Sequence, residues 1–211
     1  MMALSHRFLF VHIPKTGGNS VQNILRAYSE DEIVCREPYQ DGVERFELLN
    51  PTYGFSKHSP LWEYRAKLPP ETYASLFKFA CVRNPWERAV SYYFSPHRQV
   101  STFTREAFVE FLPTIPPMIQ HLRETPDQPA AGIPGNFDYL MRFETLQGDF
   151  DVVCDQLGIP RQALPTRNKS ARGRVEDYYD PGTTELVREL FADDIALFGY
   201  DIPWAGAEHV L

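Results

Sequence analysis

The segment FLFVHIPKTGGNSVQNILRAY, residues 8–28, joins an apolar run to a short loop and then to a helix-like pattern. A strand that passes through such a loop into a helix offers free backbone N–H groups and the positive end of the helix dipole to an anion. The loop adds an ammonium group, polar side chains and two glycines that permit close backbone approach; these residues are Lys15, Thr16, Gly17, Gly18, Asn19 and Ser20. The pattern predicts an anion-binding loop, and an ordinary strand–turn–helix with an exposed lysine is the alternative.

The order of residues in this loop differs from that of a nucleoside-triphosphate P-loop. In G-x-x-x-x-G-K-[ST] the lysine follows the glycines and a hydroxyl binds Mg²⁺, whereas here the order is P-K-T-G-G-N-S and no G-K-S/T occurs in the chain. The second strong strand ends in Arg83 rather than in the aspartate that usually holds Mg²⁺. We therefore expect a phosphate-binding loop without a metal.

A second motif, FKFACVRNPWERAVSYYF, places Arg83 at a strand end and Ser91 eight residues later, inside the next helix. Arginine binds phosphate bidentately, and open α/β sheets bind ligands at the carboxyl ends of their strands. In the alternative interpretation Arg83 pairs with Glu87 and Ser91 is a buried helix serine. The motif alone leaves both possibilities open.

Strand and helix patterns alternate along the chain, which predicts an α/β fold with a central, mostly parallel sheet flanked by helices. The expected strands are 7–13, 32–36, 76–83 and 137–143, and the expected helices begin at Asn19, Pro85 and Glu144, with a last one at 183–198. Residues 113–136 hold six prolines and two glycines and are expected to be an irregular loop. The length of 211 residues suggests one domain, 1–211.

The composition excludes several classes of protein. A net charge of −7 argues against a nucleic-acid binder. The cysteines are three and far apart, without C-x-x-C, which disfavours a disulfide framework or structural zinc. The apolar runs fall short of the ~20 residues that span a bilayer. We expect a soluble, cytoplasmic protein.

Together the two motifs resemble those of the PAPS-dependent sulfotransferases, in particular the carbohydrate branch of heparan-sulfate 2-O-sulfotransferase type and its bacterial relatives. HIPKTGGNS is similar to the 5′-phosphosulfate loop of that family, and VRNPWERAVSYY is similar to its 3′-phosphate motif. The resemblance continues in MRFETL, LGIP, LPTRNKS and DDIALFGYD. It therefore covers most of the chain, and residues 95–135 are the part that matches least. It implies a P-loop-like three-layer fold and an enzyme of the EC 2.8.2 type.

The resemblance also implies the cofactor, PAPS (3′-phosphoadenosine 5′-phosphosulfate), with adenosine 3′,5′-bisphosphate as product and no metal. The residues that would hold the 5′-phosphosulfate are Lys15, Thr16, Gly17, Gly18, Asn19 and Ser20, and those for the 3′-phosphate are Arg83 and Ser91. Within the basic segment 161–175, a lid over the cofactor is expected at Arg167, Asn168, Lys169 and Ser170. A solvated basic loop is the alternative for this segment.

Sulfuryl transfer to a hydroxyl needs a base, a cation on the leaving group and in-line alignment. Lys15 is placed to supply the cation. We expect His58 to be the base, because related sulfotransferases carry a catalytic histidine in a comparable stretch, whereas His12 is expected to be structural or supporting. The expected acceptor is a hydroxyl on a carbohydrate or small alcohol. The alternatives are a P-loop kinase or other NTP-dependent enzyme, and a catalytically inactive nucleotide-binding protein.

Overall fold

The computed structural model describes residues 1–35, 40–42, 45–165 and 173–205. The chain divides into two compact units, one of residues 1–82 and 118–167 and the other of residues 83–117 and 168–211. We call them the sheet unit and the helical unit and describe each by itself. The expectation of one domain over 1–211 stays a prediction.

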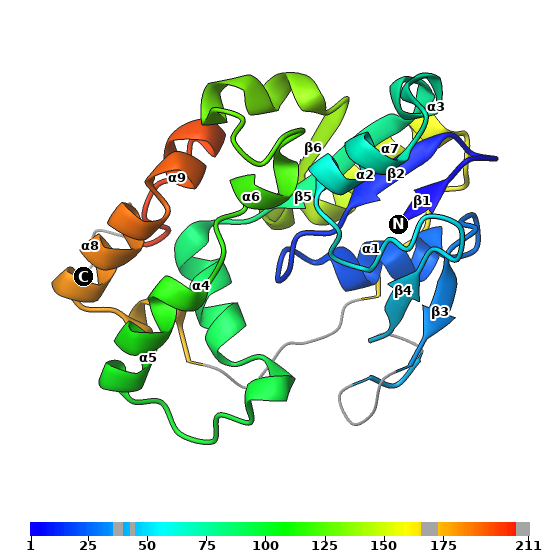
Figure 1. Ribbon diagram of the computed structural model, residues 1–211. Helices are drawn as coiled ribbons and strands as arrows, with labels where there is room; N and C mark the ends of the chain where they lie inside the picture. Colours follow the sequence, from blue (N-terminus) through cyan, green and yellow to red (C-terminus); the bar gives the residue numbers. More distant parts are fainter. Residues whose placement is uncertain (36–39, 43–44, 166–172, 206–211) are drawn as a thin grey trace. The chain divides into compact units, whose positions relative to one another are not determined.

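The sheet unit contains a four-stranded sheet in the order β1-β2-β5-β6. Strands β2, β5 and β6 are parallel to one another, with Phe8 opposite Phe77 and Phe79 opposite Tyr139, and β1 is antiparallel to β2. The strand bounds are Met2–Ala3 for β1, Phe8–Val11 for β2, Phe77–Val82 for β5 and Tyr139–Arg142 for β6. The predicted central, mostly parallel sheet is confirmed (Figure 1).

Both faces of this sheet are buried. Alternate residues such as Phe8, Phe10 and Phe79 pack into one apolar cluster with helices α1 (Gly18–Leu25) and α7 (Leu146–Leu157). Leu9 and Val11, which point to the opposite face by the alternation of a strand, are also fully buried. A strand buried on both faces reads as a continuous apolar run, which is why FLFV was recognisable. The other helices of the unit are α2 (Leu61–Lys67), α3 (Pro70–Ser75), α6 (Ile119–Leu122), η3 (Ala130–Asn136) and η4 (Phe143–Thr145).

The strand expected at 32–36 is present as β3 (Glu32–Val34), but it does not join the central sheet. It pairs with β4 (Glu47–Leu49) in a separate antiparallel sheet, with Ile33 opposite Leu48. Neither β1 nor β4 was expected, because strands of two or three residues are too short to show a period.

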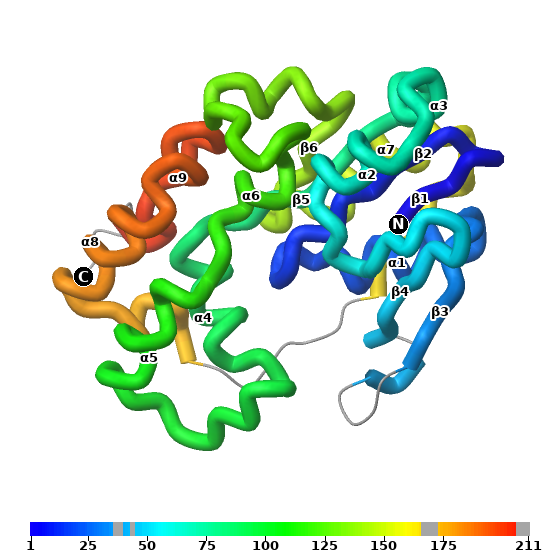
Figure 2. Tube along the Cα trace, viewed as in Figure 1, coloured from blue at the N-terminus to red at the C-terminus, as the bar shows by residue number. Residues whose placement is uncertain are grey.

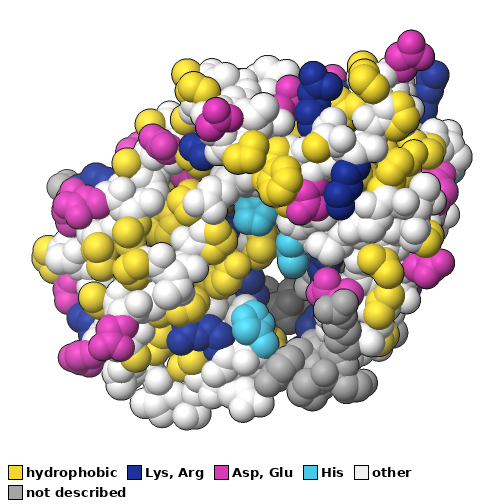
Figure 3. Space-filling model, viewed as in Figure 1, with side chains coloured by type: hydrophobic (Ala, Val, Ile, Leu, Met, Phe, Trp, Pro, Cys, Tyr) yellow, Lys and Arg dark blue, Asp and Glu magenta, His cyan; other side chains and the backbone are white. Residues whose placement is uncertain are grey.

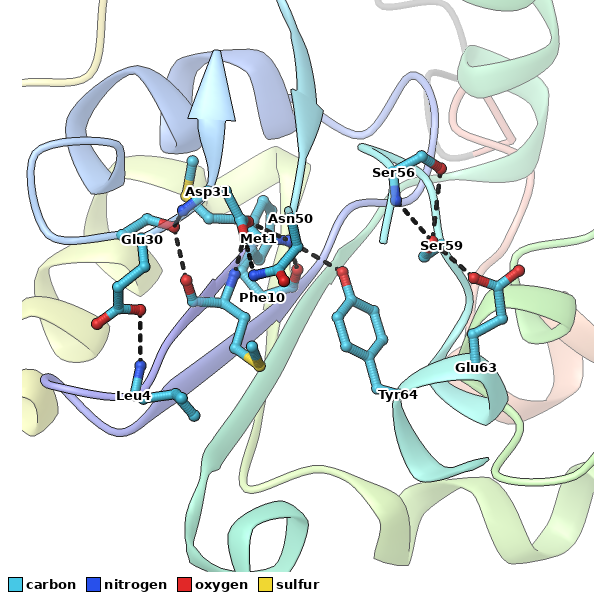
Figure 4. A network of polar contacts seen from close by, with 12 residues as sticks. Met1, Leu4, Phe10, Glu30, Asp31, Asn50, Ser56, Ser59, Glu63 and Tyr64 are labelled. Carbon is cyan, nitrogen blue, oxygen red and sulfur yellow. Dashed lines mark hydrogen bonds and ion pairs between the residues drawn. The ribbon is translucent and has the colours of Figure 1, made fainter. Parts of the chain in front are cut away.

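A polar network ties the start of the chain to later segments of the sheet unit (Figure 4). The Met1 amino group donates to the Phe10 carbonyl at 2.9 Å and to the Tyr64 hydroxyl at 3.2 Å. The Asn50 side chain donates to Asp31 at 2.8 Å. Asp31 also lies 4.0 Å from the Met1 amino group, so that these contacts connect β2 and α2 to the loop that follows β4.

The helical unit is built around an aromatic core. Trp86 donates from its indole to the Thr184 carbonyl at 3.1 Å, and the Tyr179 hydroxyl donates to the Trp86 carbonyl at 2.8 Å. Tyr93 and Phe108 pack edge to face in the same core. The elements are α4 (Pro85–Tyr93), η1 (Pro96–Arg98), α5 (Arg105–Phe111), η2 (Leu112–Thr114), η5 (Val175–Tyr178), α8 (Pro181–Leu190) and α9 (Ala192–Phe198).

Two expectations need correction in detail. The helix expected at 183–198 consists of α8 and α9, because the chain leaves helical geometry at Phe191, whose φ is −118°. The segment 113–136, expected to be irregular, contains α6 and η3, and the trace in Figure 2 follows it through these turns. The buried Asn136 side chain, which donates to the Leu122 carbonyl at 2.9 Å, closes these turns against one another.

Candidate functional site

The loop before α1 contains two residues in the left-handed region of backbone conformation. Gly17 is the N-cap of α1 with a φ of 87°, and Lys15 has a φ of 70°, so two nearby residues adopt the left-handed conformation. No side chain caps α1, and the Ser20 N–H donates to the Gly17 carbonyl at 3.0 Å, whereas the earliest N–H groups of a helix have no acceptor within it. A lysine in this conformation is strained by about 1–3 kcal/mol, a cost typical of functional sites. The predicted strand–loop–helix geometry is thus present.

Both glycines of the loop are constrained, Gly17 chiefly by its φ of 87° and Gly18 by packing. A Cβ on Gly17 would lie 2.7 Å from Cδ2 of Leu146, and a Cβ on Gly18 would lie 2.1 Å from Cδ2 of His12. Distances below 3.0 Å force a neighbour to move. The loop therefore packs with its backbone directly against α7 and the His12 ring.

The side chains of the loop differ in what they already bind. The Thr16 hydroxyl is buried and donates to the Ile13 carbonyl at 2.9 Å, which stabilises the loop itself. The Ser20 hydroxyl donates to the Pro165 carbonyl at 3.1 Å. Lys15 and Asn19 are half-buried at the loop. An anion would therefore meet the backbone N–H groups and Lys15 first, and Ser20 would have to exchange its present acceptor.

His58 lies in the same unit, in the loop between β4 and α2. Its Nδ1 is 2.9 Å from the His12 carbonyl oxygen. Because a carbonyl oxygen only accepts hydrogen bonds, Nδ1 carries the hydrogen and Nε2 keeps its lone pair. Next to it, Ser59 accepts from the Ser56 N–H at 2.9 Å and donates to Glu63 at 2.8 Å, which fixes this loop to α2 (Figure 4).

The electrostatic surroundings keep His58 neutral. Burial is the largest cause that lowers its pKa, to about 4, and the charges of Lys57, the Met1 amino group and Lys15 lower it further. The hydrogen bond to His12 acts in the opposite direction. At neutral pH the imidazole is therefore unprotonated at Nε2, as a general base must be.

Lys57 contributes charge from a fixed position. Its ammonium is buried, donates to the Phe46 carbonyl at 2.5 Å and lies 5.4 Å from the centre of the Phe46 ring. Burial lowers its pKa, and Glu47 counteracts this in part. The backbone carbonyl and the ring of Phe46 thus hold the Lys57 ammonium in place, one residue before His58.

The second motif lies in the helical unit. The Arg83 guanidinium is 3.2 Å from the Glu87 carboxylate, and its side chain is 16% exposed. Ser91 is half-buried and lies one helical turn after Glu87 in α4. Asn84 caps α4 by accepting from the Trp86 N–H at 3.1 Å. The pairing of Arg83 with Glu87 that the sequence left open is present, whereas Ser91 keeps some exposure to solvent.

The predicted site residues thus fall into three groups. The sheet unit contains the loop residues together with His58, and the helical unit contains Arg83 and Ser91. Arg167, Asn168, Lys169 and Ser170 lie outside the described residues. Two contacts of His12 were not predicted from the sequence, one with Gly18 and one with His58. No spacing rule relates His12 to His58, because the two residues are 46 positions apart.

Two further properties of the described residues bear on the site. They contain no cluster of three or more His, Cys, Asp or Glu residues that could hold a metal ion. Within the same residues, no helix has the length and apolar character needed to cross a membrane.

A family model described as "Sulfotransferase family" matches residues 1–201. Because this match covers nearly the whole chain of 211 residues, the protein belongs to the sulfotransferase family. No curated protein and no solved structure matches the chain. The predicted membership of the sulfotransferase family and the α/β, P-loop-like fold are confirmed, and family membership makes the protein a transferase of sulfuryl groups. The carbohydrate branch and the use of PAPS stay predictions.

Proposed function

We propose that the protein transfers the sulfuryl group of PAPS to a hydroxyl group, as an enzyme of the EC 2.8.2 type. The observation that carries this proposal is the state of His58: a neutral imidazole that donates from Nδ1 to the His12 carbonyl and whose pKa is lowered chiefly by burial. Lys15 lies in the same unit, and its charge makes the smallest contribution to this lowering. A neutral base and a cation are two of the groups that the reaction needs.

The reaction proceeds as an in-line displacement at sulfur. The acceptor oxygen forms a bond to sulfur while the bond from sulfur to the bridging phosphate oxygen breaks. Nε2 of His58 takes the hydroxyl proton, and the Lys15 ammonium stabilises the negative charge that develops on the departing phosphate. The products are a sulfate ester and adenosine 3′,5′-bisphosphate, and no metal takes part in these steps.

Cofactor binding is assigned to three groups of residues. The residues of the loop hold the 5′-phosphosulfate: Lys15, Thr16, Gly17, Gly18, Asn19 and Ser20. Thr16 contributes through its backbone, because its hydroxyl already donates to the Ile13 carbonyl. Arg83 and Ser91 hold the 3′-phosphate. The Glu87 carboxylate, 3.2 Å from the Arg83 guanidinium, orients this side chain before the phosphate arrives. The lid expected from the family resemblance falls on Arg167, Asn168, Lys169 and Ser170, which lie outside the described residues.

The acceptor is a carbohydrate or a small alcohol. On the face shown in Figure 3, acidic and basic side chains are interspersed, and the whole chain carries a charge of −7. A long sulfated polymer requires an extended positive surface, so the negative net charge of the chain favours a small, weakly charged acceptor. Cys35, Cys81 and Cys154 are all free thiols, which supports a reducing compartment such as the cytoplasm.

Two measurements test the proposal against its rivals. Calorimetry should show binding of adenosine 3′,5′-bisphosphate without Mg²⁺ and much weaker binding of ATP with Mg²⁺. Incubation with ³⁵S-labelled PAPS and a panel of sugars, phenols and alcohols should label at least one acceptor. Preference for ATP–Mg²⁺ would favour the kinase, whereas binding of the bisphosphate without transfer to any acceptor would favour an inactive binding protein.

A further inference from the structure

The imidazole of His12 lies between the first turn of α1 and the proposed base. Its Cδ2 and Nε2 atoms occupy the space beside Gly18, 2.1 and 2.3 Å from where a Cβ of that residue would be. The centre of its ring is 4.6 Å from that of His58, with 55° between the ring planes. Its side chain is buried, at 3% exposure. One ring therefore contacts both the anion-binding loop and the base.

Hydrogen bonding accounts only weakly for a histidine at this position. An interaction with the Gln22 side chain acts to raise the pKa of His12. Among the described residues, however, neither Nδ1 of His12 nor either amide atom of the fully buried Gln22 makes a hydrogen bond of normal geometry. Burial and the neighbouring charges lower the pKa of His12 well below its usual value, so the ring is uncharged. The shape of the ring and its place in the packing therefore explain its presence better than its polar atoms do.

The packing of His12 bears directly on the orientation of His58. The backbone carbonyl of His12 holds the Nδ1 hydrogen of His58, while the His12 side chain packs against the His58 ring. Phe10 also stacks on the His12 ring, with 5.8 Å between ring centres and 18° between planes, and limits its movement. A shift of Gly18 would therefore move the His12 ring, and a shift of the His12 ring would alter the hydrogen bond that selects Nε2 as the base.

We propose that His12 is a positioning residue: its ring couples the first turn of α1 to the orientation and tautomer of His58. This inference rests on the proposed role of His58 as base. Binding of an anion at the loop restrains Gly18 and thereby holds the base in the orientation for proton transfer. Because misplacement of a reacting group by about 1 Å lowers rates by ~100-fold, loss of the His12 ring is expected to lower kcat rather than to weaken cofactor binding.

The test combines kinetics with ¹⁵N NMR of the histidine side chains in the full-length protein, with His58 assigned from the spectrum of His58→Ala. In the ligand-free wild type, His58 should be protonated at Nδ1. In His12→Leu, we expect a mixture of tautomers, a kcat about 10–100-fold lower and a KM for PAPS within about threefold of wild type. Val11→Ala is the control, because Val11 is equally buried in β2 and points to the opposite face.

A second variant keeps the inference testable if His12→Leu does not fold. Gly18→Ala inserts a methyl group against the His12 ring and should disturb the His58 tautomer in the ligand-free protein. Gly148→Ala is its matched control, because Gly148 lies in α7 and a Cβ added there would meet no atom within 4 Å. His58 of both controls should retain the Nδ1-protonated form.

Three results would overturn the inference: protonation of His58 at Nε2 in the wild type, an unchanged tautomer in the folded variants, or a lost tautomer with unchanged kcat. These results are distinct from a failure of the proposed function. A fully active His58→Ala variant would remove His58 as the base, whereas the NMR measurement reports the position of His58 whether or not the protein transfers sulfuryl groups.

Discussion

The Nδ1 atom of His58 lies 2.9 Å from the carbonyl oxygen of His12, so the backbone at the end of β2 determines which nitrogen of His58 can accept a proton. The same short segment leads directly into the loop of Lys15 and the glycines. The end of β2 thus leads into the proposed anion-binding loop and also orients the proposed base.

The protonation state of His58 can be measured directly. Its pKa is lowered to about 4, chiefly by burial, so its NMR resonances should show no titration between about pH 8 and pH 5.5, where an ordinary histidine with a pKa of about 6.5 would titrate. Bound PAPS brings negative charge that should raise this pKa in the complex. A midpoint near 6.5 in the ligand-free protein would contradict the buried, neutral imidazole.

Arg83→Ala separates the two phosphate positions of the cofactor. If Arg83 binds the 3′-phosphate, the variant should lose about 1.5–3 kcal/mol of PAPS affinity, the range of a hydrogen bond to a charged group. Its affinity for adenosine 5′-phosphosulfate, which lacks that phosphate, should change little. Calorimetry with both ligands makes the comparison, and equal losses would contradict the assignment.

Gly17→Ala tests the packing of the anion-binding loop. The new methyl group would lie 2.7 Å from Leu146, and the φ of 87° adds strain, so we expect a loss of about 2–4 kcal/mol in the free energy of unfolding. Gly54→Ala is the matched control, because Gly54 has a φ of 66° but no neighbour within 4 Å. Urea denaturation should show a clearly smaller loss for Gly54→Ala, and equal losses would show that strain alone matters.

The buried, neutral His12 makes stability depend on pH. Its pKa is lowered in the folded state, so the unfolded state binds more protons, and the free energy of unfolding falls as pH falls below the unfolded pKa of about 6.5. This contribution to stability is lost progressively as pH falls below about 6.5 toward the folded-state pKa. Urea denaturation at pH 7 and at pH 5 should show a larger drop for the wild type than for His12→Leu. The same pH dependence in both proteins would contradict a buried neutral His12.

Much of the fold was predictable because the strands β2 and β5 are apolar throughout most of their length and the helices α1 and α4 begin at a glycine loop and a proline. The residues of the loop and the spacing of Arg83 and Ser91 were also predictable from the sequence, because each motif is local in sequence. The pairing of β3 with β4 was not predictable, because it depends on contacts between short segments. Likewise the contact of His12 with His58 joins residues 46 positions apart.

The side-chain partners of the loop were also hidden from the sequence. The Thr16 hydroxyl was expected to bind the phosphosulfate, and in the structure it donates to the Ile13 carbonyl. A buried hydroxyl bonds to the nearest backbone acceptor, and which acceptor is nearest depends on the left-handed conformations of Lys15 and Gly17. A sequence pattern does not specify those conformations at a lysine.

The most direct test of the account is transfer of ³⁵S-labelled sulfuryl from PAPS by His58→Ala, compared with wild type and with His6→Ala, which alters an exposed histidine on the β1–β2 turn. We predict that His58→Ala lowers the rate of transfer by at least ~100-fold, as expected for loss of a general base, while calorimetry shows unchanged binding of adenosine 3′,5′-bisphosphate. His6→Ala should transfer at the wild-type rate. Transfer by His58→Ala at the wild-type rate would contradict the role of His58 as the general base.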